Sequence, residues 1–121
     1  DVAKMMQLFL QKGSYGNKRY FSEKTFDTFN TSYYAAVGVQ RGLGFDKRIA
    51  EVGPTCACVS EASFGHTGFT GDIAWVDPET DLVYVFLSNR TYPEVTAEGN
   101  KLSKEKIRED IQKIIQEAII K

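Results

Sequence analysis

The stretch FTGDIAWVDPETDLVYVFLSNR, residues 69–90, decides the fold that we predict for this chain. Residues 69–76 alternate between two sides with the two-residue period of a β-strand. The run DPETD, residues 77–81, is typical of a type I turn, because a proline in second position already has the required φ angle. Residues 82–87 are continuously apolar, so we expect that strand to be covered on both faces and central in its sheet. The stretch therefore predicts an antiparallel hairpin.

Amphipathic patterns on either side of this hairpin predict helices. Residues 2–9 repeat apolar side chains at helical spacing, and Lys12-Gly13 supplies a basic last turn and a stop. Ser22 is expected to cap a second, short helix, and Ser103 a final one. In the final helix we expect a buried apolar stripe of Ile107, Ile111, Ile114, Ile115 and Ala118, opposite a solvated face of Lys106, Glu109, Asp110, Lys113 and Glu117.

These patterns predict the α+β class: an antiparallel sheet of at least three strands, with N-terminal helices and a C-terminal helix packed on it. The segment Arg41-Gly42-Leu43-Gly44-Phe45 predicts a strand weakened by glycines, where another backbone packs close. The 121 residues and their 42% hydrophobic share fit a single domain, residues 1–121. The chain opens on DVAKMMQLFLQKG, already inside a helix, so we expect it to be the C-terminal part of a longer domain.

Charge and cysteine content narrow the function classes. A formal net charge of −1, from 15 basic and 16 acidic residues, predicts no nucleic-acid partner. No apolar run approaches the ~20 residues of a membrane span. Cys56 and Cys58 would lie on the same side of an extended chain, too constrained for an easy mutual disulfide, so we expect free thiols. With one histidine in the chain the ligands of a zinc site are too few, so we expect no metal.

The segment Phe64–Gly71 concentrates glycine and small polar residues beside the buried strand. Its glycines allow a ligand or another backbone to approach closely. His66 offers an imidazole ring, Thr67 offers a hydroxyl, and exposed N–H groups of an edge strand can hold an oxyanion. The same residues also fit a glycine-bent strand that carries a surface histidine and binds nothing.

Residues 65–90, GHTGFTGDIAWVDPETDLVYVFLSNR, resemble the late segment of serine β-lactamases, DD-peptidases and related esterases, closest to the class C and esterase branch. In that family a strand carries a Lys/His-Thr/Ser-Gly triplet at the active site and pairs with the strand that follows. The helices and the Gly-rich strand before this segment fit the family, as does the final helix, which in the family packs on the sheet. The resemblance implies a serine hydrolase related to penicillin-binding proteins, which acts on a β-lactam, peptide or small ester through a serine ester.

The resemblance assigns roles to four residues. His66, Thr67 and Gly68 are assigned to substrate binding: His66 takes the place of the family's Lys or His, Thr67 contacts substrate from the middle position, and Gly68 gives clearance. The backbone N–H of Phe69 is one of two oxyanion donors, and the other belongs to the nucleophile. The family's nucleophile motif, S-x-x-K, precedes the H-T-G strand by most of the domain. We therefore expect the nucleophile to lie upstream of this chain, and the chain alone to be inactive.

Two literal matches to family motifs are rejected. Ser103-Lys104-Glu105-Lys106 spells S-x-x-K but follows the H-T-G strand, and Lys106 is expected on the polar side of a charged turn rather than in the partly buried place of a catalytic lysine. Tyr15-Gly16-Asn17 spells the family's Y-x-N, yet the family's version precedes the helix that opens this sequence. We expect a Gly-rich turn there.

The resemblance also implies partners and a location. It implies no metal or organic cofactor, and a periplasmic or secreted protein. The expected partners are the N-terminal part of the same domain and a small acyl substrate, and the chain alone is expected to self-associate through exposed apolar surface. The competing hypothesis is a non-catalytic binding or interaction domain with this fold, while a metal-binding module is discounted. An S-x-x-K at the start of a buried helix upstream would favour the enzyme.

Overall fold

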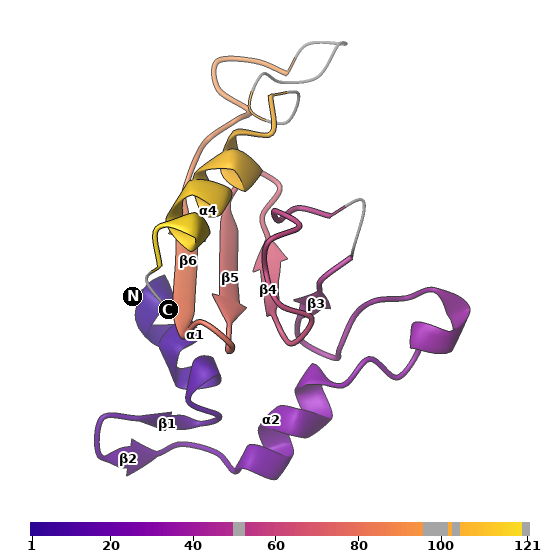
Figure 1. Cartoon of the computed structure of the whole chain (residues 1–121), viewed down its shortest axis with the longest axis vertical. Helices are drawn as coiled ribbons and strands as arrows, with labels where there is room; N and C mark the ends of the chain where they lie inside the picture. The colour runs from indigo at the N-terminus through magenta and orange to yellow at the C-terminus, as the bar shows by residue number, and fades with distance from the viewer. Residues whose placement is uncertain (50–52, 96–101, 103–104, 120–121) are drawn as a thin grey trace.

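A computed structural model of the chain describes residues 1–49, 53–95, 102 and 105–119 (Figure 1). It mixes helices with antiparallel strands, which confirms the predicted α+β class. In chain order the elements are α1 (Val2–Leu10), β1 (Ser14–Tyr15), β2 (Lys18–Arg19), α2 (Glu23–Asn30), the 3-10 helix η1 (Ala35–Val37), β3 (Asp46–Lys47), β4 (Phe64–Thr67), β5 (Ile73–Asp77), β6 (Leu82–Phe86) and α4 (Ile107–Glu117). None of the helices in the described ranges is long and apolar enough to cross a bilayer.

A four-stranded antiparallel sheet in the order β3-β4-β5-β6 carries the rest of the fold, and β1 pairs with β2 in a separate hairpin. β5 and β6 pair from Ile73↔Phe86 to Asp77↔Leu82, so the predicted hairpin is confirmed. Its first strand begins at Ile73 rather than at 69, because the residues before it form a turn. Within the described residues β6 is the last strand of the sheet and not a central one, although helices cover both of its faces (Figure 1).

Alternate residues of β5 belong to two hydrophobic clusters, one on each face of the sheet. Because both faces of β5 are covered, the residues of both clusters are apolar, and this explains why residues 73–76 of β5 include no polar side chain. On the face toward α4 the buried residues are Ile73, Trp75, Tyr84, Cys56 and Val59. On the face toward α1 and α2 they are Met6, Phe26, Phe64 and Val76.

The stop after α1 and the cap of α2 agree with the prediction, although the last turn of α1 contains no basic residue. Lys12 and Gly13, which follow α1, both have positive φ angles, 48° and 96°. The Ser22 side chain caps α2 by accepting the Thr25 N–H at 3.1 Å. A Cβ on Gly42 would lie 2.4 Å from the Phe29 carbonyl oxygen, which confirms the expected close approach of another backbone. The strand predicted over residues 41–45 is reduced to one bridge, between Arg41 and Asp46.

The face that α4 turns to the sheet is polar, so the predicted apolar stripe is wrong. Arg108 and Gln112, one turn apart, are buried, whereas Ile114 is 67% exposed. The Gln112 Oε1 atom accepts the Cys56 N–H at 3.1 Å, and the Tyr84 hydroxyl donates to the Arg108 carbonyl at 3.0 Å. Burial raises the pKa of Tyr84. A pattern of apolar residues could not reveal that the loop beneath α4 presents backbone groups that need polar partners.

The start of α4 also differs from the prediction. The helix begins at Ile107, and its N-cap residue is Lys106, with a φ angle of 50°. Ser103, the predicted cap, lies outside the described residues. Lys106 is exposed, as expected for a lysine without a catalytic role.

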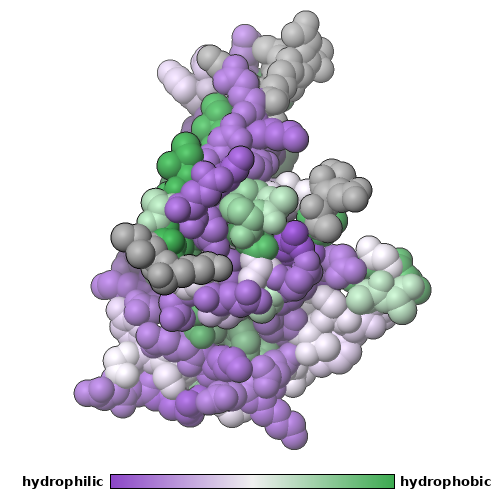
Figure 2. All heavy atoms as spheres, in the orientation of Figure 1, coloured by the Kyte–Doolittle hydropathy of each residue, from purple (hydrophilic) through white to green (hydrophobic). Residues whose placement is uncertain are grey.

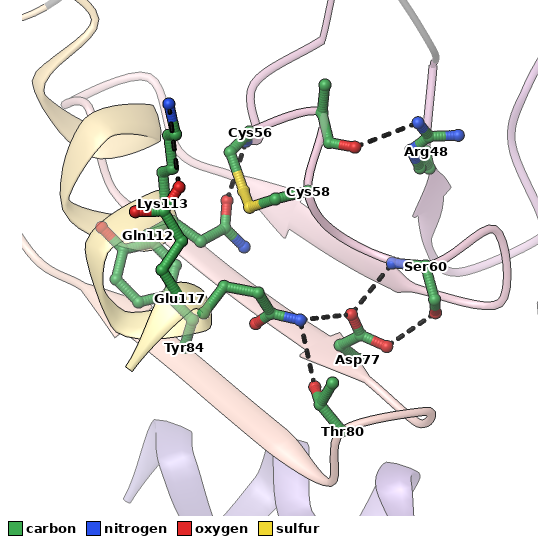
Figure 3. The surroundings of a disulfide bond; sticks show 12 residues. Arg48, Cys56, Cys58, Ser60, Asp77, Thr80, Tyr84, Gln112, Lys113 and Glu117 are labelled. Atoms are coloured by element: carbon green, nitrogen blue, oxygen red, sulfur yellow. Dashed lines mark hydrogen bonds and ion pairs between the residues drawn. A yellow bond between two sulfur atoms is a disulfide. The ribbon is translucent and has the colours of Figure 1, made fainter. Parts of the chain in front are cut away.

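Cys56 and Cys58 form a disulfide, so the prediction of free thiols is wrong (Figure 3). The prediction assumed an extended chain. Instead the chain turns at these residues, where the Val59 N–H donates to the Cys56 carbonyl, and the Cα–Cα distance of 5.2 Å lies within the range that a disulfide spans.

Candidate functional site

The turn between β4 and β5 is short and tightly bonded. The Gly68 N–H donates to the Asp72 carbonyl at 2.9 Å, and the Gly71 N–H donates to the Gly68 carbonyl at 3.0 Å. Gly71 has a φ angle of 96°, and a Cβ there would lie 2.7 Å from the Ser88 Oγ atom, so only glycine fits. The turn therefore fixes the backbone immediately after the H-T-G triplet.

The residues predicted for the site lie together at this end of β4. His66 is exposed and Thr67 half-buried, and both belong to the strand. Phe69 is 81% exposed at the tip of the turn. Within the described residues no hydrogen bond uses the Phe69 N–H or the Thr67 hydroxyl. These two donors are consequently available to an oxygen atom of a ligand.

Gly68 has a structural role that the sequence did not indicate. A Cβ at this position would lie 3.2 Å from the Asp72 Oδ2 atom and 3.3 Å from its Cβ. The glycine therefore leaves room for the Asp72 side chain, inside the turn. Clearance for a substrate, which the resemblance implies, stays a prediction.

Asp72 supports the turn through its side chain. Its carboxylate accepts the Ser88 N–H at 2.6 Å and the Thr70 hydroxyl at 2.7 Å. The Ser88 N–H, followed by the Thr70 hydroxyl, holds the pKa of Asp72 below its ordinary value. The nearby guanidinium of Arg108, which donates to the Gly71 carbonyl at 3.3 Å, acts in the same direction.

Arg41 is a residue of this region that the sequence analysis did not identify as functional. Its Nη2 atom lies 2.6 Å from the His66 Nε2 atom, and its Nε atom lies 3.2 Å from the Asp46 Oδ1 atom. The other ring nitrogen of His66, Nδ1, lies 2.7 Å from the Thr67 carbonyl oxygen. The Arg41–Asp46 bridge brings the arginine to β4. The contact between Arg41 and His66 spans 25 residues, and no spacing in the sequence predicts it.

Lys47, on the neighbouring strand β3, has a structural role. Burial lowers the pKa of its ammonium group. The ammonium donates to the Asn30 side chain at 3.2 Å and to the Ala62 carbonyl at 3.3 Å, and so joins α2 to the loop before β4. These contacts occupy it away from His66.

A second polar cluster, at the far end of β5, has all its contacts within the protein (Figure 3). The buried carboxylate of Asp77 accepts the N–H and hydroxyl of Ser60 at 2.9 and 2.6 Å. It also accepts the Glu79 N–H at 3.1 Å and the Gln116 amide at 2.9 Å. The Asp77 carboxylate thus has a structural role, and the residues predicted for the site lie at the other end of β5, so we take the β4–β5 end of the sheet as the candidate site.

Comparison with known proteins places the sequence in a recognised group. A model of the beta-lactamase family matches residues 1–107. A protein of Escherichia coli O157:H7 named "Putative D-alanyl-D-alanine carboxypeptidase" is 35% identical over 99 residues, which is 78% of this chain and 22% of that protein. Proteins of the same name from Salmonella enteritidis PT4 and Escherichia coli K12 are 34% identical over the same lengths. The chain thus spans about a fifth of these relatives.

Proposed function

The chain belongs to the beta-lactamase family, and from this we propose that it supplies one wall of the active site of a serine hydrolase. The reaction is acyl transfer through a serine ester, on a peptide such as one ending in D-alanyl-D-alanine, on a β-lactam or on a small ester. The observation that carries the proposal is the pair of unused donors, the Thr67 hydroxyl and the Phe69 N–H, at the exposed end of β4.

Each residue has a part in this proposal. The Phe69 N–H stabilises the oxyanion of the tetrahedral intermediate, because a fixed backbone donor gains strength as charge develops on the substrate oxygen. The Thr67 hydroxyl positions the acyl compound, and His66 lies beside it in the place of the family's Lys or His. The nucleophile and its general base come from an upstream segment with an S-x-x-K motif. Without that segment the chain cannot run the reaction.

The proposed partner is the remainder of the same domain. Apolar side chains gather over the flank formed by α4 and β6 (Figure 2), where Ile111, Ile114, Ile115 and Leu87 are exposed. A second apolar surface lies between α1 and α2 and is lined by Met5, Phe9, Phe21, Phe26, Phe29 and Phe45. Surfaces of this kind favour association, and in the chain alone they favour self-association.

We place the protein in the periplasm or outside the cell. The family is mostly secreted or periplasmic, and the Cys56–Cys58 disulfide is compatible with an oxidising compartment.

The test uses the full-length protein and the 121-residue chain side by side. We expect a fluorescent β-lactam or a nitrophenyl ester to acylate the full-length protein, and no turnover above buffer by the chain alone. Thr67→Val should lower kcat/KM by ~10–100-fold, since a hydrogen bond to a charged group contributes ~1.5–3 kcal/mol. Thr28→Val, which removes an exposed hydroxyl bonded within α2, is the matched control.

Two results would contradict the proposal. One is turnover by the chain alone that disappears in Ser103→Ala and survives repurification. The other is a full-length protein that has no S-x-x-K and forms no acyl adduct, which would favour the non-catalytic binding domain.

A further inference from the structure

Arg41 and His66 form part of a continuous polar chain at the candidate site. The chain runs from the Asp46 carboxylate to the Arg41 guanidinium, then to the His66 ring, and ends on the Thr67 carbonyl. The Arg41 side chain is 51% exposed and the Asp46 side chain 26% exposed, so the pair lies at the surface beside the strand. Both contacts of the ring are short, 2.6 Å at Nε2 and 2.7 Å at Nδ1.

The chemistry of the two neighbours determines which ring nitrogen carries the proton. A guanidinium has five N–H donors and no acceptor, so the Nε2 atom facing Arg41 must accept. A carbonyl oxygen only accepts, so the Nδ1 atom facing Thr67 must carry the hydrogen. Both contacts require the same form of the ring, neutral and protonated at Nδ1. A cationic ring would direct an N–H at the guanidinium and lose that bond.

The ring in turn fixes the backbone that leads to Phe69. The Thr67–Gly68 peptide is held at its carbonyl by His66 and at its N–H by the Asp72 carbonyl. The next peptide, Gly68–Phe69, is held at its carbonyl by the Gly71 N–H. Its remaining polar group is the Phe69 N–H. Loss of the His66 contact would leave the first of these two consecutive peptides held at its N–H alone.

We propose that Arg41 is a positioning residue, which holds His66 in the neutral Nδ1-protonated form and through it orients the Phe69 N–H. This inference rests on the proposed function, because it gives that N–H a role in acyl transfer. It also changes the part assigned to His66. Both ring nitrogens are engaged within the protein, so the ring supports the strand end and leaves contact with substrate to Thr67 and Phe69.

The first measurement needs no activity. His66 is the single histidine of the chain, so two-bond proton–nitrogen NMR spectra of the labelled chain at neutral pH report its ring without assignment. We expect a neutral ring protonated at Nδ1 in the wild type and a mixture of forms in Arg41→Met. Should the chain alone not fold, the spectra are recorded on the full-length protein, with His66→Asn identifying the resonances. A wild-type ring protonated at Nε2, or at both nitrogens, would overturn the inference.

The second measurement separates positioning from binding. In the full-length protein with a neutral ester, Arg41→Met should lower kcat about tenfold and leave KM nearly unchanged, a smaller loss than the ~10²–10³-fold for removing an oxyanion donor outright. Arg41→Lys, which keeps the charge and one donor group, should recover part of the rate. Arg19→Gln is the matched control, since Arg19 is 50% exposed and likewise paired with one carboxylate, on Glu23.

Coupling between the two residues gives the deciding outcome. If Arg41 acts through the ring, the effects of Arg41→Met and His66→Ala on kcat are non-additive, and the double variant is little worse than either single one. Additive effects, or an unchanged kcat in Arg41→Met, would overturn the positioning role. A wild-type protein that acylates nothing would refute the proposed function, while the ring spectra would still decide whether Arg41 sets the form of His66.

Discussion

The two turns that flank β5 both depend on an aspartate, and they differ in what the aspartate leaves open. At the β5–β6 end, Asp77 is buried and accepts four donors from a loop, the turn and α4. At the β4–β5 end, Asp72 accepts two, and the neighbouring Phe69 N–H and Thr67 hydroxyl have no acceptor within the described residues. One end of the sheet is closed by its own contacts, and the other presents donors outward. In the function that we propose, ligand binding belongs to the open end of β5, while the contacts of the closed end contribute to stability.

The largest test of this contrast is Asp77→Ala. It leaves several buried donors without an acceptor, at ~1–3 kcal/mol each, so we expect the free energy of unfolding to fall by roughly 3 kcal/mol or more. Asp72→Ala should cost clearly less. Urea unfolding followed by the fluorescence of Trp75, the single tryptophan, measures both. Equal losses for the two variants would remove the distinction between the ends.

Removal of the disulfide tests whether the loop that carries Ser60 needs the Cys56–Cys58 bond to hold its contact with Asp77. The bond joins residues two apart, and so small a loop restricts the unfolded chain little. We expect Cys56→Ser with Cys58→Ser to lower the free energy of unfolding by about 2 kcal/mol or less. A loss as large as that of Asp77→Ala would show that the loop, and not the carboxylate, holds this end together.

The open end has an acid-sensitive contact at Asp72. Its pKa is lowered in the folded protein, so the ionised carboxylate contributes stability above its ordinary pKa of ~3.9. That contribution is lost as the pH falls through the depressed folded value. We expect the unfolding free energy of Asp72→Asn to change less between pH ~5 and pH ~2 than that of the wild type. Parallel curves for the two proteins would contradict the assignment.

The smallest effect on stability is expected for Thr67→Val, within about 0.5 kcal/mol of the wild type, because its hydroxyl has no partner in the described part of the chain. The same substitution should reduce activity, as proposed above. Thermal unfolding of wild type and variant gives the first quantity. A substantial loss of stability would mean that the hydroxyl belongs to the fold.

Local pattern was enough to predict the hairpin, α1 and the cap of α2. The β5–β6 turn was predictable because Asp77 and Pro78 have strong turn preferences, and Ser22 because a cap is a contact over three residues. The turn after β4 was missed, since the alternation continues through Phe69 and Gly71 although the backbone does not. The order of the strands in the sheet could not be predicted from these local patterns, because the continuously apolar sequence of β6 is typical of a central strand.

Contacts between distant residues were the other limit. Arg41 meets His66 across 25 residues, and Gln112 meets Cys56 across 56. Hydrophobicity alone would place Gln112 on the solvent side of its helix. Gln112 is buried instead, because its side chain accepts the Cys56 N–H, which would otherwise lack a partner. The triplet His66-Thr67-Gly68 could be found because it is contiguous, and its place at the end of β4 agrees with the expected strand. Its catalytic role remains a prediction.

The Asp77 cluster also has a consequence for synthesis on the ribosome. Gln116 follows Asp77 by 39 residues, so β5 and β6 are synthesised before the last donor to this carboxylate exists. During that interval Asp77 cannot be withdrawn from water with its full set of partners, and the nascent sheet keeps one end hydrated. The Asp77 carboxylate can gain its last donor only after α4 has been translated, so folding at that end of the sheet is completed only once α4 has formed.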